Sequence, residues 1–283
     1  AVGPVGTPVP PEAQTIEVKG LDVWPGLIDA GTTVGLAEIG SLNETLDFAD
    51  AARYQPELRA AIALRADSEH VRVTRANGVL AGLVEPSGGV ISGQAALADF
   101  DGWVPSEMAF EDPAALSVNI PRFVHRPVGS QPGRGGQGGD NPDPNARRKE
   151  QIEALKEQFL KARRYDEVVA EAKAKALNAP RVDVRLAALA PYAKGERLVI
   201  LHADERTEIL DALALAKELK LRAAISGAAD AWKVAAEIKE AGVPVLVAGT
   251  MNFPAREHDP YDAAYANPAK LHAAGVTFAI RSA

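Results

Sequence analysis

An imidazole and a carboxyl group stand two residues apart where an apolar run of the sequence ends. His202 and Asp204 follow residues 198–201, which are typical of a buried strand. An imidazole can hold a divalent metal ion or transfer a proton near neutral pH, and a carboxyl group can do the same. We therefore predict a catalytic role for both. The alternatives are a structural histidine and a helix cap, and capping is favoured for the next residue, Glu205.

Three further polar residues are candidates for binding a small ligand. Thr33 follows an apolar run, Gln94 lies in a glycine-flanked segment, and Arg281 follows the last apolar run. A threonine hydroxyl can donate a hydrogen bond to a ligand, although such residues often belong to turns. A guanidinium group can bind a carboxylate through two parallel hydrogen bonds. We predict that Thr33, Gln94 and Arg281 line the site.

Regular alternation of strands and helices fills the last third of the chain. Apolar strands separated by amphipathic helices predict parallel β-α units, because a parallel strand needs a helical crossover. This spacing fits a barrel or a doubly wound sheet, and periodicity alone does not choose between them. The predicted strands are 198–201, 221–225, 243–248 and 276–280, and the predicted helices are 207–219, 230–241 and 268–274.

The first two thirds of the chain have weaker patterns. Residues 78–84 predict a buried strand, and residues near 55–77 predict a helix. The glycine-rich stretch 129–145 lacks the spacing of a dinucleotide-binding loop and the apolar strand before it, so we interpret it as a flexible loop. Residues 147–177 are rich in Ala, Glu, Lys and Arg and predict a long amphipathic helix or a pair of helices, inserted into the domain.

Composition narrows the classes of function. The net charge of −7 argues against a nucleic-acid partner, which needs a clustered basic excess. The chain has no cysteine, which excludes disulfides and a cysteine nucleophile and fits the cytoplasm and the periplasm equally well. No apolar run approaches the ~20 residues of a membrane span. No signal peptide is visible, although one removed in maturation would leave no trace.

Residues 23–30, VWPGLIDA, resemble the first-strand signature of the amidohydrolase superfamily, in the branch similar to imidazolonepropionases. The resemblance extends along nearly the whole chain. It implies a TIM-like (β/α) barrel over residues 23–283, with residues 1–22 as a lead-in or remnant of a small β-sandwich that is incomplete at both chain ends. Further matching segments are 74–79, 89–94, 201–204, 242–245 and 274–276.

The metal ligands of that family are replaced in this chain. The family carries His-any-His after the aspartate of the first strand, and these places hold Gly31 and Thr33. The sixth-strand histidine falls at residues 226–227, and the eighth-strand aspartate falls near residues 282–283. Only His202 stands where a family ligand is expected. One histidine does not hold a catalytic ion such as zinc, which usually needs three protein ligands.

Two functions follow from the resemblance and from these replacements. The first is hydrolysis of a C–N bond in a small amide, cyclic amide or peptide, centred on His202 and Asp204 with a degenerate metal site. The second is a catalytically inactive barrel that serves as a structural or regulatory subunit, paired with an active paralogue. We also expect a homo- or hetero-oligomer, because the barrel ends without the closing helix and sandwich strands of the family, which a longer protein or another chain would supply.

Overall fold

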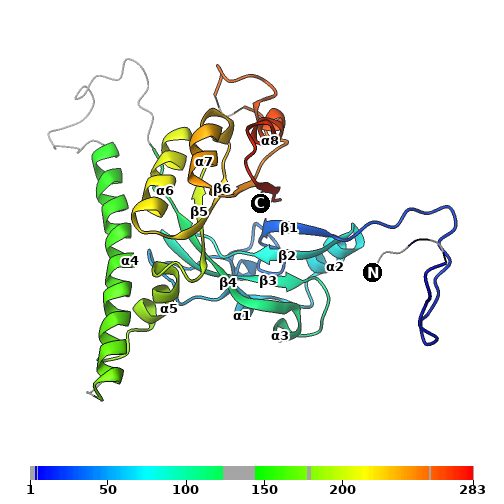
Figure 1. The fold of residues 1–283 in the computed structure, drawn as a ribbon, viewed down its shortest axis with the longest axis horizontal. Coiled ribbons are helices and arrows are strands. Elements are labelled where there is room, and N and C mark those ends of the chain that lie inside the picture. Colours follow the sequence, from blue (N-terminus) through cyan, green and yellow to red (C-terminus); the bar gives the residue numbers. More distant parts are fainter. Residues whose placement is uncertain (1–3, 5, 124–143, 177–179, 255, 283) are drawn as a thin grey trace.

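The chain forms an α/β barrel whose eight strands are neighbours in sequence order (Figure 1). The computed structural model describes residues 4, 6–123, 144–176, 180–254 and 256–282. The strands are β1 (Leu27–Thr32), β2 (Val79–Val84), β3 (Ile91–Asp99), β4 (Ala109–Asn119), β5 (Leu198–Ala203), β6 (Arg222–Gly227), β7 (Val245–Val247) and β8 (Phe278–Ile280).

One strand runs against the others. β3 pairs antiparallel with both β2 and β4, whereas every other neighbouring pair is parallel. The prediction of parallel β-α units in the last third of the chain is therefore confirmed from β5 to β8. The antiparallel β3 departs from the regular (β/α) barrel that the family resemblance implies. Residues 85–90 connect β2 to β3 without a helix, so β3 returns beside β2 as a hairpin does.

The barrel is nearly closed between its first and last strands. β1 and β8 lie in contact. Across this seam Asp29 Oδ1, on β1, accepts a hydrogen bond of 3.0 Å from the backbone N–H of Ser282. The Ser282 hydroxyl donates to the other oxygen of the same carboxylate. The aspartate of the first-strand signature therefore joins the two ends of the sheet.

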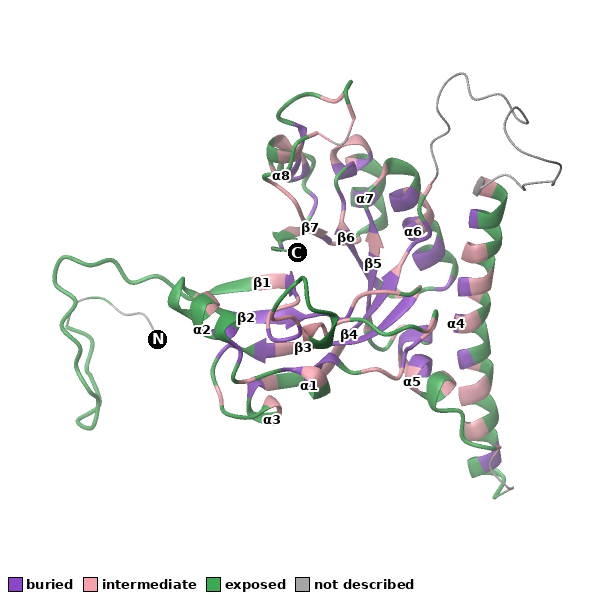
Figure 2. Cartoon of the chain, turned by 180° about the vertical axis from the view of Figure 1, so that it is seen from behind, coloured by how far each residue is buried: buried purple, intermediate pink, exposed green. Residues whose placement is uncertain are grey.

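Helices cover the outside of the barrel, and the main hydrophobic core lies between them and the sheet (Figure 2). Val199 and Leu201 of β5 belong to this outer core, in one buried cluster with Phe159 and Ile209 from helices. The helices are α1 (Ala60–Ala63), α2 (Glu69–Ala76), α3 (Pro105–Met108), α4 (Pro144–Ala174), α5 (Val184–Ala193), α6 (Arg206–Glu218), α7 (Ala235–Ala241) and α8 (Ala263–Ala274), with 3-10 turns η1 (Asn43–Thr45) and η2 (Ala231–Lys233).

The alternating residues of each strand point into the barrel. Leu83, Ala95, Ala115 and Ile200 form a small apolar cluster there. Because side chains on a strand alternate between its two faces, the residues two positions further along also face inward. At β2, β4 and β5 these residues are polar, so the interior changes from apolar to polar toward the carboxyl ends of the strands.

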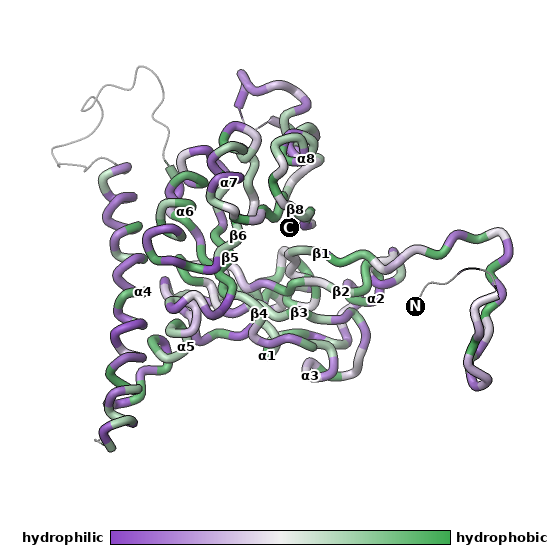
Figure 3. The backbone as a smooth tube through the Cα atoms, in the orientation of Figure 1, coloured by the Kyte–Doolittle hydropathy of each residue, from purple (hydrophilic) through white to green (hydrophobic). Residues whose placement is uncertain are grey.

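Two sequence predictions need correction or restriction. Residues 54–59 are not helical but run beside β3, where the Gln55 N–H donates to the Ile91 carbonyl at 2.9 Å. The predicted helix over 55–77 is therefore reduced to α1 and α2. The predicted long helix is confirmed as α4, in which most residues are hydrophilic (Figure 3). The glycine-rich stretch 129–145 lies almost wholly outside the described residues.

The N-terminal segment extends away from the barrel (Figure 1). Residues 6–26 are exposed along their length, and none of them belongs to a strand. The segment carries large apolar side chains, including Trp24, which is 82% exposed. In the part of the chain that the structure describes, no helix is long and apolar enough to cross a membrane.

Candidate functional site

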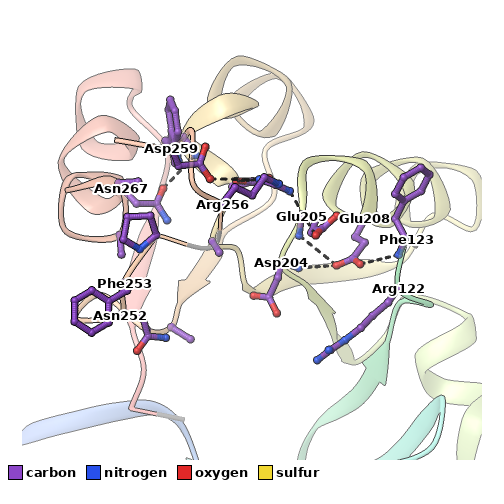
Figure 4. A pocket seen from close by; sticks show the side chains of 18 of the residues that line it. Arg122, Phe123, Asp204, Glu205, Glu208, Asn252, Phe253, Arg256, Asp259 and Asn267 are labelled. Carbon is purple, nitrogen blue, oxygen red and sulfur yellow. Dashed lines mark hydrogen bonds and ion pairs between the residues drawn. The ribbon is translucent and has the colours of Figure 1, made fainter. Parts of the chain in front are cut away.

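A cavity of about 620 Å³ opens at the carboxyl ends of β5 to β7 (Figure 4). Ligand-binding cavities in proteins typically measure ~300–1,000 Å³. Barrel enzymes place their chemistry at this end of the strands. Its polar lining includes Arg122, Asp204, Asn252 and Arg256, and aromatic side chains, among them Phe253, form part of its wall.

Ion pairs fix one side of this cavity. Arg256 Nη1 lies 2.8 Å from Asp230 Oδ2, and Lys233 Nζ lies 2.7 Å from Asp259 Oδ1 and 2.8 Å from Asp230 Oδ1. Arg256 Nη2 also lies 3.4 Å from Glu205 Oε1. The loops that follow β5, β6 and β7 are thus joined to each other, which holds the cavity open.

The Asp230 carboxylate is the centre of that network. Burial acts to raise its pKa, but hydrogen bonds from Lys233 and Arg256 outweigh burial and hold the pKa below its usual value. A carboxyl group with a lowered pKa stabilises the folded state above its unfolded-state pKa of about 4. The stabilisation is lost as pH falls through the lower folded-state pKa, so the loops should loosen only in strong acid.

Asp204 lies on the other side of the cavity, where it belongs to the lining and is exposed to solvent through the opening. Burial, followed by the nearby carboxylate of Glu208, raises the pKa of Asp204, and the charges of Arg122 and His202 oppose this rise. The side chain lies against Gly227, where a Cβ atom would collide with Asp204 Oδ1. In Figure 4 the carboxyl group of Asp204 and the side chain of Arg122 point into the same space.

The raised pKa of Asp204 predicts a pH-dependent effect of Asp204→Asn. The folded state binds the proton of this carboxyl more tightly than the unfolded state, so the residue costs stability as pH rises past its unfolded-state pKa. At pH 7 the variant should melt about 1–2 °C above the wild type, because solvent screening keeps the effect small. The gain should vanish near pH 3, where both states are protonated. Thermal melts between pH 3 and 8 measure this, and a variant that melts below the wild type at pH 7 would contradict it.

A second group of polar residues lies inside the barrel. The Glu85 carboxylate, at the end of β2, accepts from Arg281 Nη1 at 3.0 Å and from the Ser117 hydroxyl at 3.0 Å. His202 Nε2 lies 3.1 Å from Glu85 Oε2, so the tautomer with its proton on Nε2 donates to it. Arg281 Nη1 also donates to Ser226 Oγ at 2.5 Å. These five residues form the interior cluster.

The interior cluster does not fit a divalent metal ion. Its nitrogen atoms beside β1 belong to Arg281, whose N–H groups are donors and cannot ligate a cation. The buried Nε–H of Arg281 has no acceptor among the described residues. A hydrogen-bond acceptor could bind at this position, whereas a metal cation could not. Over the described part of the chain, no group of three or more His, Asp or Glu side chains is placed to hold a metal. We therefore assign no metal-dependent step to this chain.

Comparison with solved structures gives the barrel a close structural counterpart. The chain is similar to the crystal structure of an amidohydrolase from Thermotoga maritima MSB8, with a TM-score of 0.81 and 20% sequence identity. The match covers 99% of this chain and 70% of the other chain. The chain has the barrel fold of an amidohydrolase. At this identity the similarity shows the fold alone, and neither a family model nor a curated protein matches the sequence.

The residues predicted to form the site are distributed over four places. Asp204 lines the cavity, whereas His202 and Arg281 belong to the interior cluster. The Thr33 carbonyl accepts from the N–H of Leu36 in a turn, and Thr33 is not part of the cavity lining. The amide of Gln94 donates to the Pro56 carbonyl at 2.6 Å, away from the cavity.

Two important residues were not predicted. Glu85 was not among the predicted site residues, yet it is 2% exposed and connects β2, β4, β5 and Arg281. Arg122 follows β4 and reaches the cavity. The alternation along β2 offers a signal for Glu85, since it lies two residues after the inward-facing Leu83. No pattern in the sequence distinguishes Arg122 from a surface arginine.

Proposed function

We propose that this chain is an amidohydrolase-superfamily barrel of the imidazolonepropionase-like branch that binds a small amide or peptide without a metal-dependent hydrolytic centre. The observation that carries the proposal is that the side chains of Asp204 and Arg122 both point into a cavity of about 620 Å³ at the carboxyl ends of the strands. The barrel fold and the resemblance of residues 23–30 to the family's first strand support the family. The replacement of its histidines by Gly31 and Thr33 supports the loss of the metal.

The two side chains define the chemistry of the ligand. The Arg122 guanidinium suits a carboxylate, which it can bind through two hydrogen bonds. Burial and the nearby Glu208 carboxylate raise the pKa of Asp204, and this carboxyl can donate a hydrogen bond to a carbonyl oxygen when it is protonated. Phe253, which is 95% exposed, offers apolar surface beside them. A molecule that carries a carboxylate and an amide carbonyl, such as an N-acyl amino acid or a dipeptide, meets these requirements.

Binding of N-acetyl amino acids and dipeptides by calorimetry and thermal shift tests this proposal. We expect at least one of them to stabilise the protein. Arg122→Gln should weaken that binding about tenfold or more, because it removes a charge-assisted contact of ~1.5–3 kcal/mol. Arg72→Gln is a matched control, since Arg72 lies on the surface of α2 and pairs with Glu69. A panel without any binder, or equal binding by Arg122→Gln and the control, would contradict the proposal.

Hydrolysis of the bound C–N bond is a second candidate, and the raised pKa of Asp204 favours it. A carboxyl group whose pKa is moved toward neutrality suits general acid–base catalysis. In this alternative His202, held by Glu85 through Nε2, assists Asp204. Metal-free protein should then cleave a molecule that binds, and Asp204→Asn should abolish turnover while it still binds. Product formation unchanged in Asp204→Asn would exclude this role.

A structural or regulatory subunit is the remaining role that we propose for the barrel. The support comes from apolar side chains exposed together before and within β1. Trp24 is 82% exposed, Leu27 63% and Ile28 69%, and such patches mark surfaces that associate. We expect a homo- or hetero-oligomer in solution. Native mass spectrometry measures this, and a stable monomer at micromolar concentration would count against it.

A further inference from the structure

Arg281 places a positive charge inside the barrel. Its side chain is 8% exposed, and that of its partner Glu85 is 3% exposed. A charge removed from water to this extent is costly unless it is paired and hydrogen-bonded. Arg281 Nη1 donates to Glu85 Oε1 at 3.0 Å and to the Ser226 hydroxyl, whereas its Nε–H has no acceptor among the described residues.

Glu85 balances that charge and connects it to the surrounding strands. Its second oxygen accepts from Ser117 on β4, at 3.0 Å, and lies 3.1 Å from His202 Nε2 on β5. Both carboxylate oxygens are therefore engaged with protein donors. Loss of the guanidinium would leave the buried carboxylate with only the Ser117 hydroxyl and the His202 imidazole as partners.

Gly31 provides the room for this pair. A Cβ atom at residue 31 would lie 2.6 Å from Arg281 Cζ and 2.8 Å from Arg281 Nε, and closer still to Glu85 Oε1. The colliding atoms are ends of side chains, but both ends are buried and bonded to each other, so neither can move without breaking the pair. The guanidinium thus occupies the space beside the strand position where the family resemblance expects a metal-binding histidine.

From these contacts we infer that the barrel interior is a cation site that the chain fills with its own Arg281 guanidinium. The ligand class of the site is a planar, monovalent nitrogen cation held by Glu85 and Ser226. A divalent ion is excluded because the charge at the position beside β1 is already positive and both Glu85 oxygens are occupied. This inference does not depend on the ligand of the cavity.

Neutral substitutions of the two charged residues test the inference. Arg281→Gln leaves Glu85 without its cation, and Glu85→Gln leaves Arg281 without its anion. Each should lower the melting temperature by about 5–10 °C, and the double variant should recover at least half of the loss, because it removes both buried charges. The exposed pair Arg75 and Asp101, changed to Gln and Asn, is the control and should shift little.

Rescue by a free cation tests the chemistry of the site. Arg281→Ala should regain several degrees in millimolar methylguanidinium chloride, measured against the same concentration of sodium chloride. The wild type, Arg75→Ala and the double variant Glu85→Gln, Arg281→Ala should gain nothing. The inference would be overturned if the double variant Glu85→Gln, Arg281→Gln were no more stable than Arg281→Gln alone. It would also be overturned if methylguanidinium stabilised the double variant Glu85→Gln, Arg281→Ala, which lacks the Glu85 carboxylate. If Arg281→Ala does not fold, the comparison of the glutamine variants decides.

Discussion

Restoring the two family histidines, by Gly31→His with Thr33→His, is expected to unfold the barrel and not to build a metal centre. Any side chain at residue 31 must displace the Arg281 guanidinium, which lies 2.6 Å from the position of a Cβ atom. Breaking a buried ion pair costs about 3–5 kcal/mol, and overpacking adds to it. Because whole domains are stable by only ~5–15 kcal/mol, the variant should be largely insoluble or melt far below the wild type.

Chemical denaturation of the single variants assigns this effect to residue 31. Gly31→Ala should already lose a few kcal/mol, about the cost of overpacking in a core. Thr33→His is the matched control, since Thr33 lies in a turn and is only half-buried. A folded double variant with near-wild-type stability and one bound zinc ion per chain would refute this explanation of the interior.

Phe159→Ala is expected to have the second largest effect, through the packing of α4 on the barrel. Phe159 is fully buried, in the cluster that joins α4 to α5 and the outer face of β5. Truncation of a buried phenylalanine typically costs about 3–5 kcal/mol, from lost apolar burial and the cavity left behind. The expected result is a single cooperative transition, moved to lower denaturant, because α4 and the barrel share one core.

The neighbouring Leu160→Ala provides the control for that experiment. Leu160 is 45% exposed and should change the free energy of unfolding by less than about 1 kcal/mol. Urea denaturation followed by circular dichroism compares the two variants. Two separate transitions, or equal effects of the two substitutions, would show that α4 is an appendage that folds independently.

The half of the barrel with regular alternation could be predicted from the sequence. Strands β5 to β8 and their helices follow from apolar runs separated by amphipathic segments, and their burial depends mostly on local neighbours. The antiparallel β3 was missed because its sequence, ISGQAALAD, begins beside a glycine turn and is rich in alanine. Small residues carry little strand signal, and the burial of β3 depends on two flanking strands and on residues 54–59.

The contacts among the polar residues inside the barrel could not be predicted from the sequence. Gly31 was recognised as the loss of a metal ligand, but the sequence did not show that a glycine is needed there to leave space for the Arg281 guanidinium. Glu85 and Arg281 are 196 residues apart in the chain, so their pairing follows only from closure of the barrel. Arg281 was expected to bind the carboxylate of a ligand, and the structure instead pairs it with a carboxylate of the protein itself.

Metal analysis of the purified protein tests the central claim most directly. The protein is incubated with zinc, manganese or iron(II), desalted, and measured by plasma mass spectrometry beside a His202→Ala variant. A barrel that carries its own cation should retain far less than one ion per chain, with no difference between the two proteins. One tightly held ion per chain that disappears in His202→Ala would contradict the account.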